Sequence, residues 1–309
     1  MRPSLRDAGL GQLQELLTEQ VDPRYGDIDA ASVEELAQLM NEADATVPAA
    51  VGAAMSQIVP AIVAISERLA TGGRLLYVGA GTAGRIGVLD ASECVPTFNT
   101  PPDLVVGLIA GGNDALLNAT EGAEDDIEAG TAVIDEQRVG AADALVGIAA
   151  SGRTPYVLAA LRAARRRGAL TVSLSCNGDT PLSAEAEFPI EILVGPEIVA
   201  GSTRLKAGTA QKLVLNMIST IAMVRLGKTY GNLMVDLRPT NGKLRERAIR
   251  IVQAVSGVER RQAKVALQRA EYDVKLAILI AGRNLDVAEG RRRLVLASGR
   301  LRTALEMDA

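Results

Sequence analysis

The sequence predicts an α/β fold: a doubly wound, parallel five-stranded sheet with N-terminal helices before it and a small C-terminal helical domain after it. Short apolar runs rich in β-branched residues, each bounded by Gly or Pro, predict the strands at 74–78, 104–109, 144–148, 170–174 and 189–194. Helical patterns separate most of these runs. Such β-α alternation is typical of a parallel sheet with helices on both faces.

Helices are predicted before, between and after the strands, over 31–42, 47–69, 114–136, 155–167 and 202–226. Pro60 is expected to kink the second of them. Shorter, charge-rich helical stretches follow Gly242. We therefore predict three parts: an N-terminal helical segment (1–50), the α/β domain (51–242) and the small helical domain (243–309).

The charge balance and the apolar runs exclude several classes of partner. Lys and Arg number 33 against 37 Asp and Glu, a net charge of -4, so no nucleic-acid partner is expected. The longest apolar stretch, around 213–224, is well short of the roughly 20 residues that a membrane span needs. The N-terminal residues show no export signal, so we expect a cytoplasmic protein that binds no membrane.

The chain contains no histidine, which is the commonest metal ligand and the commonest general base. Cys94 and Cys176 are far apart in the sequence and form no metal-ligand spacing. We expect neither a metal nor another cofactor. Any acid-base chemistry must then use carboxylates, Lys, Tyr or Cys.

A glycine-rich loop follows the first predicted strand. Residues 79–84, GAGTAG, match G-x-G-x-x-G, which suggests dinucleotide binding. That function also needs an acidic residue at the end of the second strand, where this chain has LIAGG (108–112). The loop still allows close approach of a ligand and points amides at it from a helix N-terminus, so Gly81 and Thr82 are candidate binding residues.

A second loop, ASGRTP (150–155), follows the third predicted strand. Its hydroxyls and amides precede a helix whose first turn accepts proline, an arrangement that suits an anion. Ser151, Gly152 and Thr154 are therefore candidate phosphate-binding residues. The alternative is that Thr154 serves only as a helix N-cap. We favour phosphate, because capping alone does not require Ser-Gly-x-Thr.

Two long segments carry a resemblance to a known family. The segments VGAGTAGRIGVLDASEC (78–94) and GPEIVAGSTRLKAGTAQK (195–212) closely resemble those of N-acetylmuramic acid 6-phosphate etherases, which have a sugar isomerase domain. The second segment is shared with the glucokinase regulatory proteins of animals. The resemblance implies cleavage of the D-lactyl ether at C3 of a phosphorylated amino sugar by elimination and water addition. It also implies a homodimer with residues of both chains at each site.

The resemblance assigns the two proton-transfer roles to Glu93 and Glu124. Glu93 would donate a proton to the departing lactate, which requires a pKa raised by burial, and Glu124 would act as the ionised base. If the surrounding residues are helical, Glu121 shares the face of Glu124, and the base could be either. Each glutamate could instead be structural, Glu93 at a helix end and Glu124 in a solvated acidic run.

Three cations lie near the start of the long helix after the fifth strand. Arg204, Lys206 and Lys212 are candidates to bind phosphate, the lactyl carboxylate or the two glutamates. The chain also departs from the family at Ala83, where a serine is usual. This difference concerns the strength of sugar or phosphate binding more than the reaction.

Two other functions remain open. A non-catalytic sugar-phosphate sensor, like the glucokinase regulators, would use the same loops to control a partner protein. A phosphosugar isomerase would also need carboxylate bases and no cofactor. The single sugar domain and the two glutamates favour the etherase over the sensor, and the DASE sequence (90–93) favours it over the isomerase.

Overall fold

The computed structural model of this chain describes residues 16–237, 239 and 241–307. Parts of the predicted N-terminal segment (1–15) and of the predicted C-terminal domain (308–309) thus lie outside the described residues. Contacts divide the chain into two compact units: residues 1–92 with 103–219, and residues 93–102 with 220–309. The three-part division predicted from the sequence remains a proposal.

The first unit contains the predicted sheet, and all five predicted strands are present. They are β1 (Leu75–Gly79), β2 (Val105–Ile109), β3 (Ala144–Ile148), β4 (Leu170–Ser175) and β5 (Phe188–Glu191). All pairings are parallel, and the strand order is β2-β1-β3-β4-β5. The order reverses between β1 and β3. In open α/β sheets, ligands bind beyond the carboxyl ends of the strands at such a reversal.

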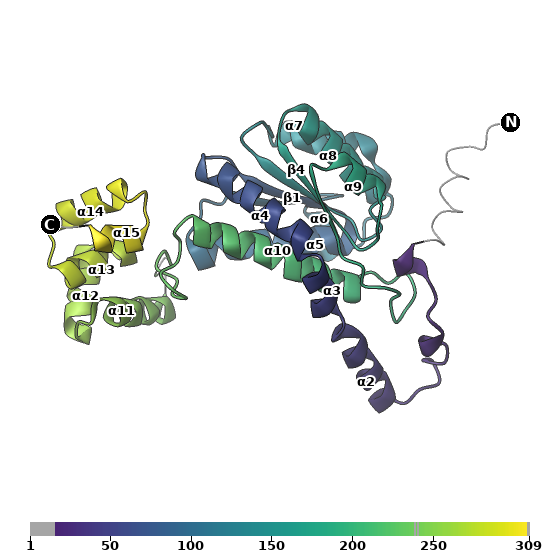
Figure 1. The fold of residues 1–309 in the computed structure, drawn as a ribbon, viewed down its shortest axis with the longest axis horizontal. Helices are drawn as coiled ribbons and strands as arrows, with labels where there is room; N and C mark the ends of the chain where they lie inside the picture. Colours follow the sequence, from purple (N-terminus) through teal and green to yellow (C-terminus); the bar gives the residue numbers. More distant parts are fainter. Residues whose placement is uncertain (1–15, 238, 240, 308–309) are drawn as a thin grey trace. The chain divides into compact units, whose positions relative to one another are not determined.

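Helices cover both faces of the sheet, so the predicted doubly wound α/β class is confirmed (Figure 1). One face carries α7 (Ile127–Glu136), α8 (Pro155–Arg166) and α9 (Pro181–Glu185); the other carries α4 (Met55–Ala70), α5 (Gly81–Phe98) and α10 (Lys206–Arg225). Every residue of β1, β3 and β4 is buried. Burial on both faces explains why β1 and β3 read as continuous apolar runs. The unit also contains η1 (Leu17–Glu19), η2 (Pro23–Tyr25), α2 (Val33–Asp44), α3 (Val47–Ala53), α6 (Asp114–Leu117) and η3 (Ala123–Asp125).

Two glycines of the GAGTAG motif allow β1 and α5 to pack closely. A Cβ atom added to Gly79 would lie 2.6 Å from the backbone nitrogen of Gly84, and one added to Gly84 would lie 2.8 Å from the Gly79 carbonyl oxygen. Neither position has room for a side chain. The motif therefore has a packing role here that does not depend on a dinucleotide.

Two predicted helices differ from those observed. The segment 114–136 is divided into α6, η3 and α7, because Asn118 is extended and Gly122 has a φ of 74°, in the left-handed region. The segment 47–69 is divided at Ala54, between α3 and α4, and Pro60 lies inside α4. The 64° bend is thus at Ala54, and a kink at Pro60, inside α4, stays a prediction.

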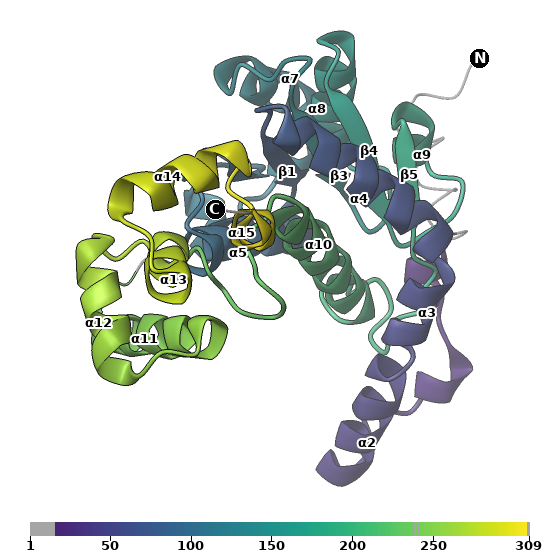
Figure 2. The ribbon, with the colours of Figure 1, turned by 60° about the vertical axis from the view of Figure 1, so that its left-hand side comes forward.

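The second unit is helical and has its own apolar core. Its helices are α11 (Gly242–Ser256), α12 (Arg260–Arg269), α13 (Val274–Arg283), α14 (Val287–Leu296) and α15 (Leu301–Glu306). They gather around α13, whose residues 274–280 are all buried (Figure 2). Lys275 is buried with them, and its ammonium group donates to Asp236 Oδ2 at 2.8 Å and to the Gly299 carbonyl at 2.9 Å. The predicted C-terminal helical region is therefore confirmed.

Among the described residues, no single helix is long and apolar enough to cross a membrane. The bent pair formed by residues 33–53 and Met55–Ala70 meets that test by length and composition only.

A buried ion pair joins the amino-terminal ends of β1 and β3. Asp143 accepts hydrogen bonds from the backbone and guanidinium of Arg74 and, at 3.0 Å, from the Gly140 amide. Burial alone would raise the pKa of Asp143, but these hydrogen bonds outweigh it and hold the pKa below its ordinary value. Because the folded state depresses this pKa, the pair stabilises the fold above the unfolded-state pKa, and the stabilisation is lost as pH falls through the folded-state pKa.

We expect Asp143→Ala to lower the free energy of unfolding by about 3 kcal/mol at pH 7, because it leaves a half-buried guanidinium without its carboxylate. Urea titrations should show this difference shrinking as the pH falls below 4. Asp135→Ala is the control, since Asp135 pairs with Arg167 on the surface and should cost less than about 1 kcal/mol. Equal losses in the two variants would contradict a special role for Asp143.

Candidate active site

A cavity of about 390 Å³ opens beyond the carboxyl ends of β1 and β3, at the reversal of strand order. Both loops singled out in the sequence line it. Hydroxyl, amide and carboxylate side chains contribute most of its polar groups. The lining residues are Glu19, Ala80, Gly81, Thr82, Ala83, Glu124, Ile148, Ala149, Ala150, Ser151, Thr154, Thr203 and Gln211.

The loop after β3 has the features of an anion site. Thr154 is the N-cap residue of α8, yet its side chain makes no capping hydrogen bond and lines the cavity. The alternative in which Thr154 serves only as a cap is therefore not supported. Ser151 Oγ accepts from the Arg153 amide at 3.2 Å, which leaves its own hydroxyl proton for a ligand. The first amides of α8 have no acceptor within the helix and favour a negative charge.

Gly152 shapes this loop but is buried and does not line the cavity. Its φ is +66°, and an added Cβ would lie 2.3 Å from Thr180 Cβ. Its carbonyl accepts from the Leu182 amide at 3.0 Å. Glycine is thus required at this position by conformation and by space.

The loop after β1 supplies a second helix N-terminus. Gly81 has a φ of +52° at the start of α5, and Thr82 and the buried Ala83 follow it along the cavity wall. With the N-terminus of α8, two helix dipoles meet the same cavity. Among the described residues that line it there is no Lys or Arg, so amides and hydroxyls would have to bind an anion here.

Glu124 lies in η3, where the chain returns from β2, and its exposed side chain lines this cavity and an adjoining one of about 300 Å³. Arg85 fixes the segment before Glu124 by donating hydrogen bonds to the carbonyls of Leu116 at 3.1 Å and Asn118 at 2.9 Å. Glu121 lines only the adjoining cavity. The shared helical face expected for the two glutamates is absent, because no α-helix joins them, and Glu124 alone borders the cavity that contains Ser151 and Thr154.

Glu19 adds a carboxylate that the sequence interpretation did not include among the site residues. The turn before it is fixed by buried contacts: Asn177 Nδ2 donates to Thr18 Oγ1 at 3.1 Å and to the Ala150 carbonyl at 2.9 Å. The Gly201 amide donates to the Thr18 carbonyl at 3.0 Å. The N-terminal segment is thereby joined to the loop after β3, and Glu19 completes one wall of the cavity.

Glu93 is not among the residues that line this cavity. It lies inside α5, so the DASE sequence is helical, and its side chain is exposed where the proton-donor role required burial. It follows Gly81 by twelve residues on the same helix, a rise of about 18 Å. It lines none of the cavities described here.

The predicted cations are also placed outside the cavity. Arg204 is exposed in the turn before α10, and Lys212 is exposed on α10. Lys206 is 4% exposed, and its Nζ donates to the Val194 carbonyl at 2.7 Å beside a different cavity of about 360 Å³. Burial lowers the pKa of Lys206, although nearby Glu197 opposes this shift. That Arg204 and Lys206 bind substrate remains a prediction.

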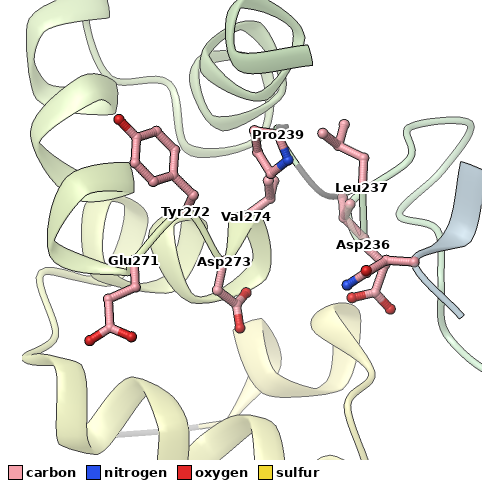
Figure 3. Close-up of a pocket in the computed structure, with 9 residues that line it drawn as sticks. Asp236, Leu237, Pro239, Glu271, Tyr272, Asp273 and Val274 are labelled. Atoms are coloured by element: carbon pink, nitrogen blue, oxygen red, sulfur yellow. The ribbon is translucent and has the colours of Figure 1, made fainter. Parts of the chain in front are cut away.

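The second unit contains a cavity of its own, of about 380 Å³, near the turn between α12 and α13 (Figure 3). Two of its carboxylates are engaged: Asp236 pairs with Lys275 and Lys228, and Asp273 accepts from the Leu276 amide at 2.9 Å. The side chains of Glu271 and Tyr272 point in different directions from this turn. No sequence prediction fell on this cavity.

The described residues contain no group of three or more His, Cys, Asp or Glu arranged to hold a metal ion. The expectation that no metal or other cofactor is needed stays a prediction.

Comparison with known proteins shows what this chain resembles. An N-acetylmuramic acid 6-phosphate etherase of Rubrobacter xylanophilus is 55% identical over 294 residues, covering 95% of this chain and 97% of that protein. One of Streptomyces coelicolor is 54% identical over 303 residues, covering 98% of this chain and 96% of that protein. This chain belongs to the N-acetylmuramic acid 6-phosphate etherase family.

The domain families that the chain matches are consistent with this assignment. Residues 57–165 match the N-terminal SIS domain of glucokinase regulatory protein, 126–221 match the SIS domain, and 231–295 match the C-terminal lid domain of glucokinase regulatory protein. A solved phosphoheptose isomerase from Francisella tularensis, 19% identical, has a TM-score of 0.50 and covers 63% of this chain and 99% of its own. That likeness shows the sugar isomerase fold alone.

Proposed function

We propose that this chain is itself an N-acetylmuramic acid 6-phosphate etherase, which converts its substrate to N-acetylglucosamine 6-phosphate and D-lactate during peptidoglycan recycling. The observation that supports this most directly is one cavity that combines Ser151, Thr154 and two helix N-termini with the carboxylate of Glu124. The former groups suit a phosphate, and the carboxylate suits proton abstraction. Relatives named for this activity are 51–55% identical to the chain.

The reaction would proceed by elimination and then hydration. Glu124 takes the C2 proton of the ring-opened aldehyde, the C2–H electron pair forms the C2=C3 double bond, and the C3–O bond breaks. Glu93 donates a proton to the departing lactate oxygen. Water then adds at C3 and gives one of its protons to Glu93, while Glu124 returns the proton to C2, so that both glutamates regain their starting states.

We further propose a cytoplasmic homodimer in which Glu93 reaches the cavity of a second copy. The exposure of Glu93 and its distance from Gly81 along α5 support this arrangement.

The test is to incubate the purified protein with N-acetylmuramic acid 6-phosphate in heavy-oxygen water. We expect D-lactate without the label and N-acetylglucosamine 6-phosphate with one heavy oxygen at C3. Label in the lactate instead would mean cleavage on the lactate side of the ether and would contradict the mechanism. No lactate at all would contradict the activity.

The second candidate is a non-catalytic sugar-phosphate sensor. The matches to both the N-terminal and the lid domains of glucokinase regulatory protein favour it. It predicts binding of the sugar phosphate without release of lactate, so the same incubation, with a binding measurement beside it, separates the two candidates.

A further inference from the structure

Gln211 is a buried amide that lacks a hydrogen-bonding partner beside the proposed active site. It lies on α10, is 1% exposed and lines the cavity that contains Ser151 and Glu124. Its Nε2 has no acceptor among the described residues. An unsatisfied buried donor destabilises the fold, so a group retained in this state calls for an explanation.

The residues around Gln211 on α10 do not explain why an amide is kept at this position. Ala207 and Val214, one turn before and after it, and the preceding residue Ala210 are fully buried and apolar. An apolar side chain at 211 would continue this buried face without an unpaired amide. Because Nε2 makes no hydrogen bond now, the amide can turn about its last torsion angle toward the cavity without losing one. A ligand in the cavity is therefore the natural acceptor.

The chemistry of the cavity limits which group of the ligand can accept the hydrogen bond from Gln211. The phosphate fits the Ser151–Thr154 loop and the N-terminus of α8. Glu19 and Glu124 also line the cavity, and among its described lining residues no Lys or Arg offsets them. A neutral amide supplies no positive charge to pair with a lactyl carboxylate. A neutral amide donor in this setting is matched best by a neutral oxygen on the sugar.

We propose that the Gln211 amide donates a hydrogen bond to the carbonyl oxygen of the 2-acetamido group of the sugar phosphate, and thereby selects N-acetylated amino sugars. This inference rests on the sugar-phosphate site of the proposed function and names the substrate group that Gln211 recognises. A hydroxyl at C2 is too short to put its oxygen at the place of the acetamido carbonyl. The amide would then stay unpaired in the complex, which is the condition under which a polar site rejects an analogue most strongly.

The test compares N-acetylglucosamine 6-phosphate with glucose 6-phosphate, which differ only at C2, by titration calorimetry on the full chain. In Gln211→Met, which keeps the length of the side chain, we expect the Kd for the N-acetylated sugar to rise about tenfold to a hundredfold and the Kd for glucose 6-phosphate to change less than about twofold. Gln211→Asn, which keeps the amide but withdraws it, should show the same selective loss. If Gln211→Met does not fold, the affinities of Gln211→Asn for the two sugars provide the test.

The matched control is Ser173→Ala in β4. Ser173 Oγ is also buried and has no hydrogen-bonding partner in the part of the chain that the structure describes, but Ser173 does not line the cavity. Its removal should therefore leave both affinities unchanged. The melting temperature of ligand-free Gln211→Met should not fall, because the unpaired amide is removed; a purely structural role predicts a fall.

Three results would overturn the proposal. Equal weakening of both sugars would place the amide on a shared part of the ligand, and no weakening would mean that it does not contact the ligand. If the wild-type protein binds neither sugar phosphate, the site itself is wrong. Binding does not require turnover, so a protein that binds with the expected selectivity but releases no lactate would contradict the etherase activity and leave this inference intact.

Discussion

Glu93→Gln and Glu124→Gln are each expected to lower the rate of lactate release by about 10²- to 10⁴-fold, the usual contribution of a positioned acid or base. An equal mixture of the two inactive proteins, after exchange of subunits, should recover up to about a quarter of the wild-type activity. The reason is the position of Glu93, which is exposed on α5 about 18 Å along the helix from Gly81. Glu124, in contrast, lines the cavity in its own chain.

In a two-fold dimer, a mixed pair then has one site with both glutamates and one site with neither. Random pairing makes half of the dimers mixed, which gives the quarter. The experiment uses two affinity tags to isolate mixed dimers and measures lactate release from them. The control replaces the Glu93→Gln partner with a chain that carries both substitutions, which leaves no complete site.

Isolated mixed dimers without activity would show that the two glutamates act within one chain. The single variants test whether each glutamate is required, since a variant that retains wild-type activity removes its residue from the mechanism. Glu121→Gln addresses the assignment left open by the sequence. It should reduce activity far less than Glu124→Gln, because Glu121 lines only the adjoining cavity.

The sheet could be predicted from the sequence because the physical signal is local. Strands buried on both faces are mostly apolar, and glycine or proline marks where each one ends. The prediction of one continuous helix over 114–136 was wrong because the signal there depends on backbone conformation. Its composition suits a helix, but Gly122 adopts a left-handed conformation and Asn118 is extended, so the chain turns twice before α7. The sequence does not predict which backbone conformation a single glycine in a helical pattern will adopt.

The candidate site shows the same division. Thr82, Ser151 and Thr154 were found because each lies just beyond a strand, where parallel strands bring their loops to one edge. Glu19 and Gln211 reach the cavity through contacts between distant parts of the chain, which no local pattern shows. One signal for Gln211 was present, a lone amide on the apolar face of α10. For Lys206, no feature of the sequence shows that its ammonium group donates to the Val194 carbonyl and does not line the cavity.

A methyl group at Gly152 is expected to damage both the fold and the site. In Gly152→Ala the new Cβ would lie 2.3 Å from Thr180 Cβ and 2.4 Å from Thr180 Oγ1, and alanine would also occupy the strained φ of +66°. Steric overlap and backbone strain together should lower the free energy of unfolding by about 2–5 kcal/mol. If the chain still folds, the loop that carries Ser151 and Thr154 must shift. We expect the Kd for N-acetylglucosamine 6-phosphate to rise about a hundredfold, since a bound phosphate depends on several aligned donors.

Gly140→Ala is the matched control, because an added Cβ at Gly140 meets nothing within 4 Å and its φ lies outside the left-handed region. The rescue variant is Thr180→Gly, which removes the side-chain atoms that Gly152→Ala would meet. Alone it loses the cap that Thr180 Oγ1 gives to the Ser183 amide, which costs roughly a few tenths of a kcal/mol when glycine is the replacement. Combined with Gly152→Ala, it should destabilise less than the sum of the two single changes, because the clash disappears while the strain at φ stays. Additive losses would mean that Gly152 is required for its backbone conformation alone, and full sugar-phosphate affinity in Gly152→Ala would mean that this loop does not hold the phosphate.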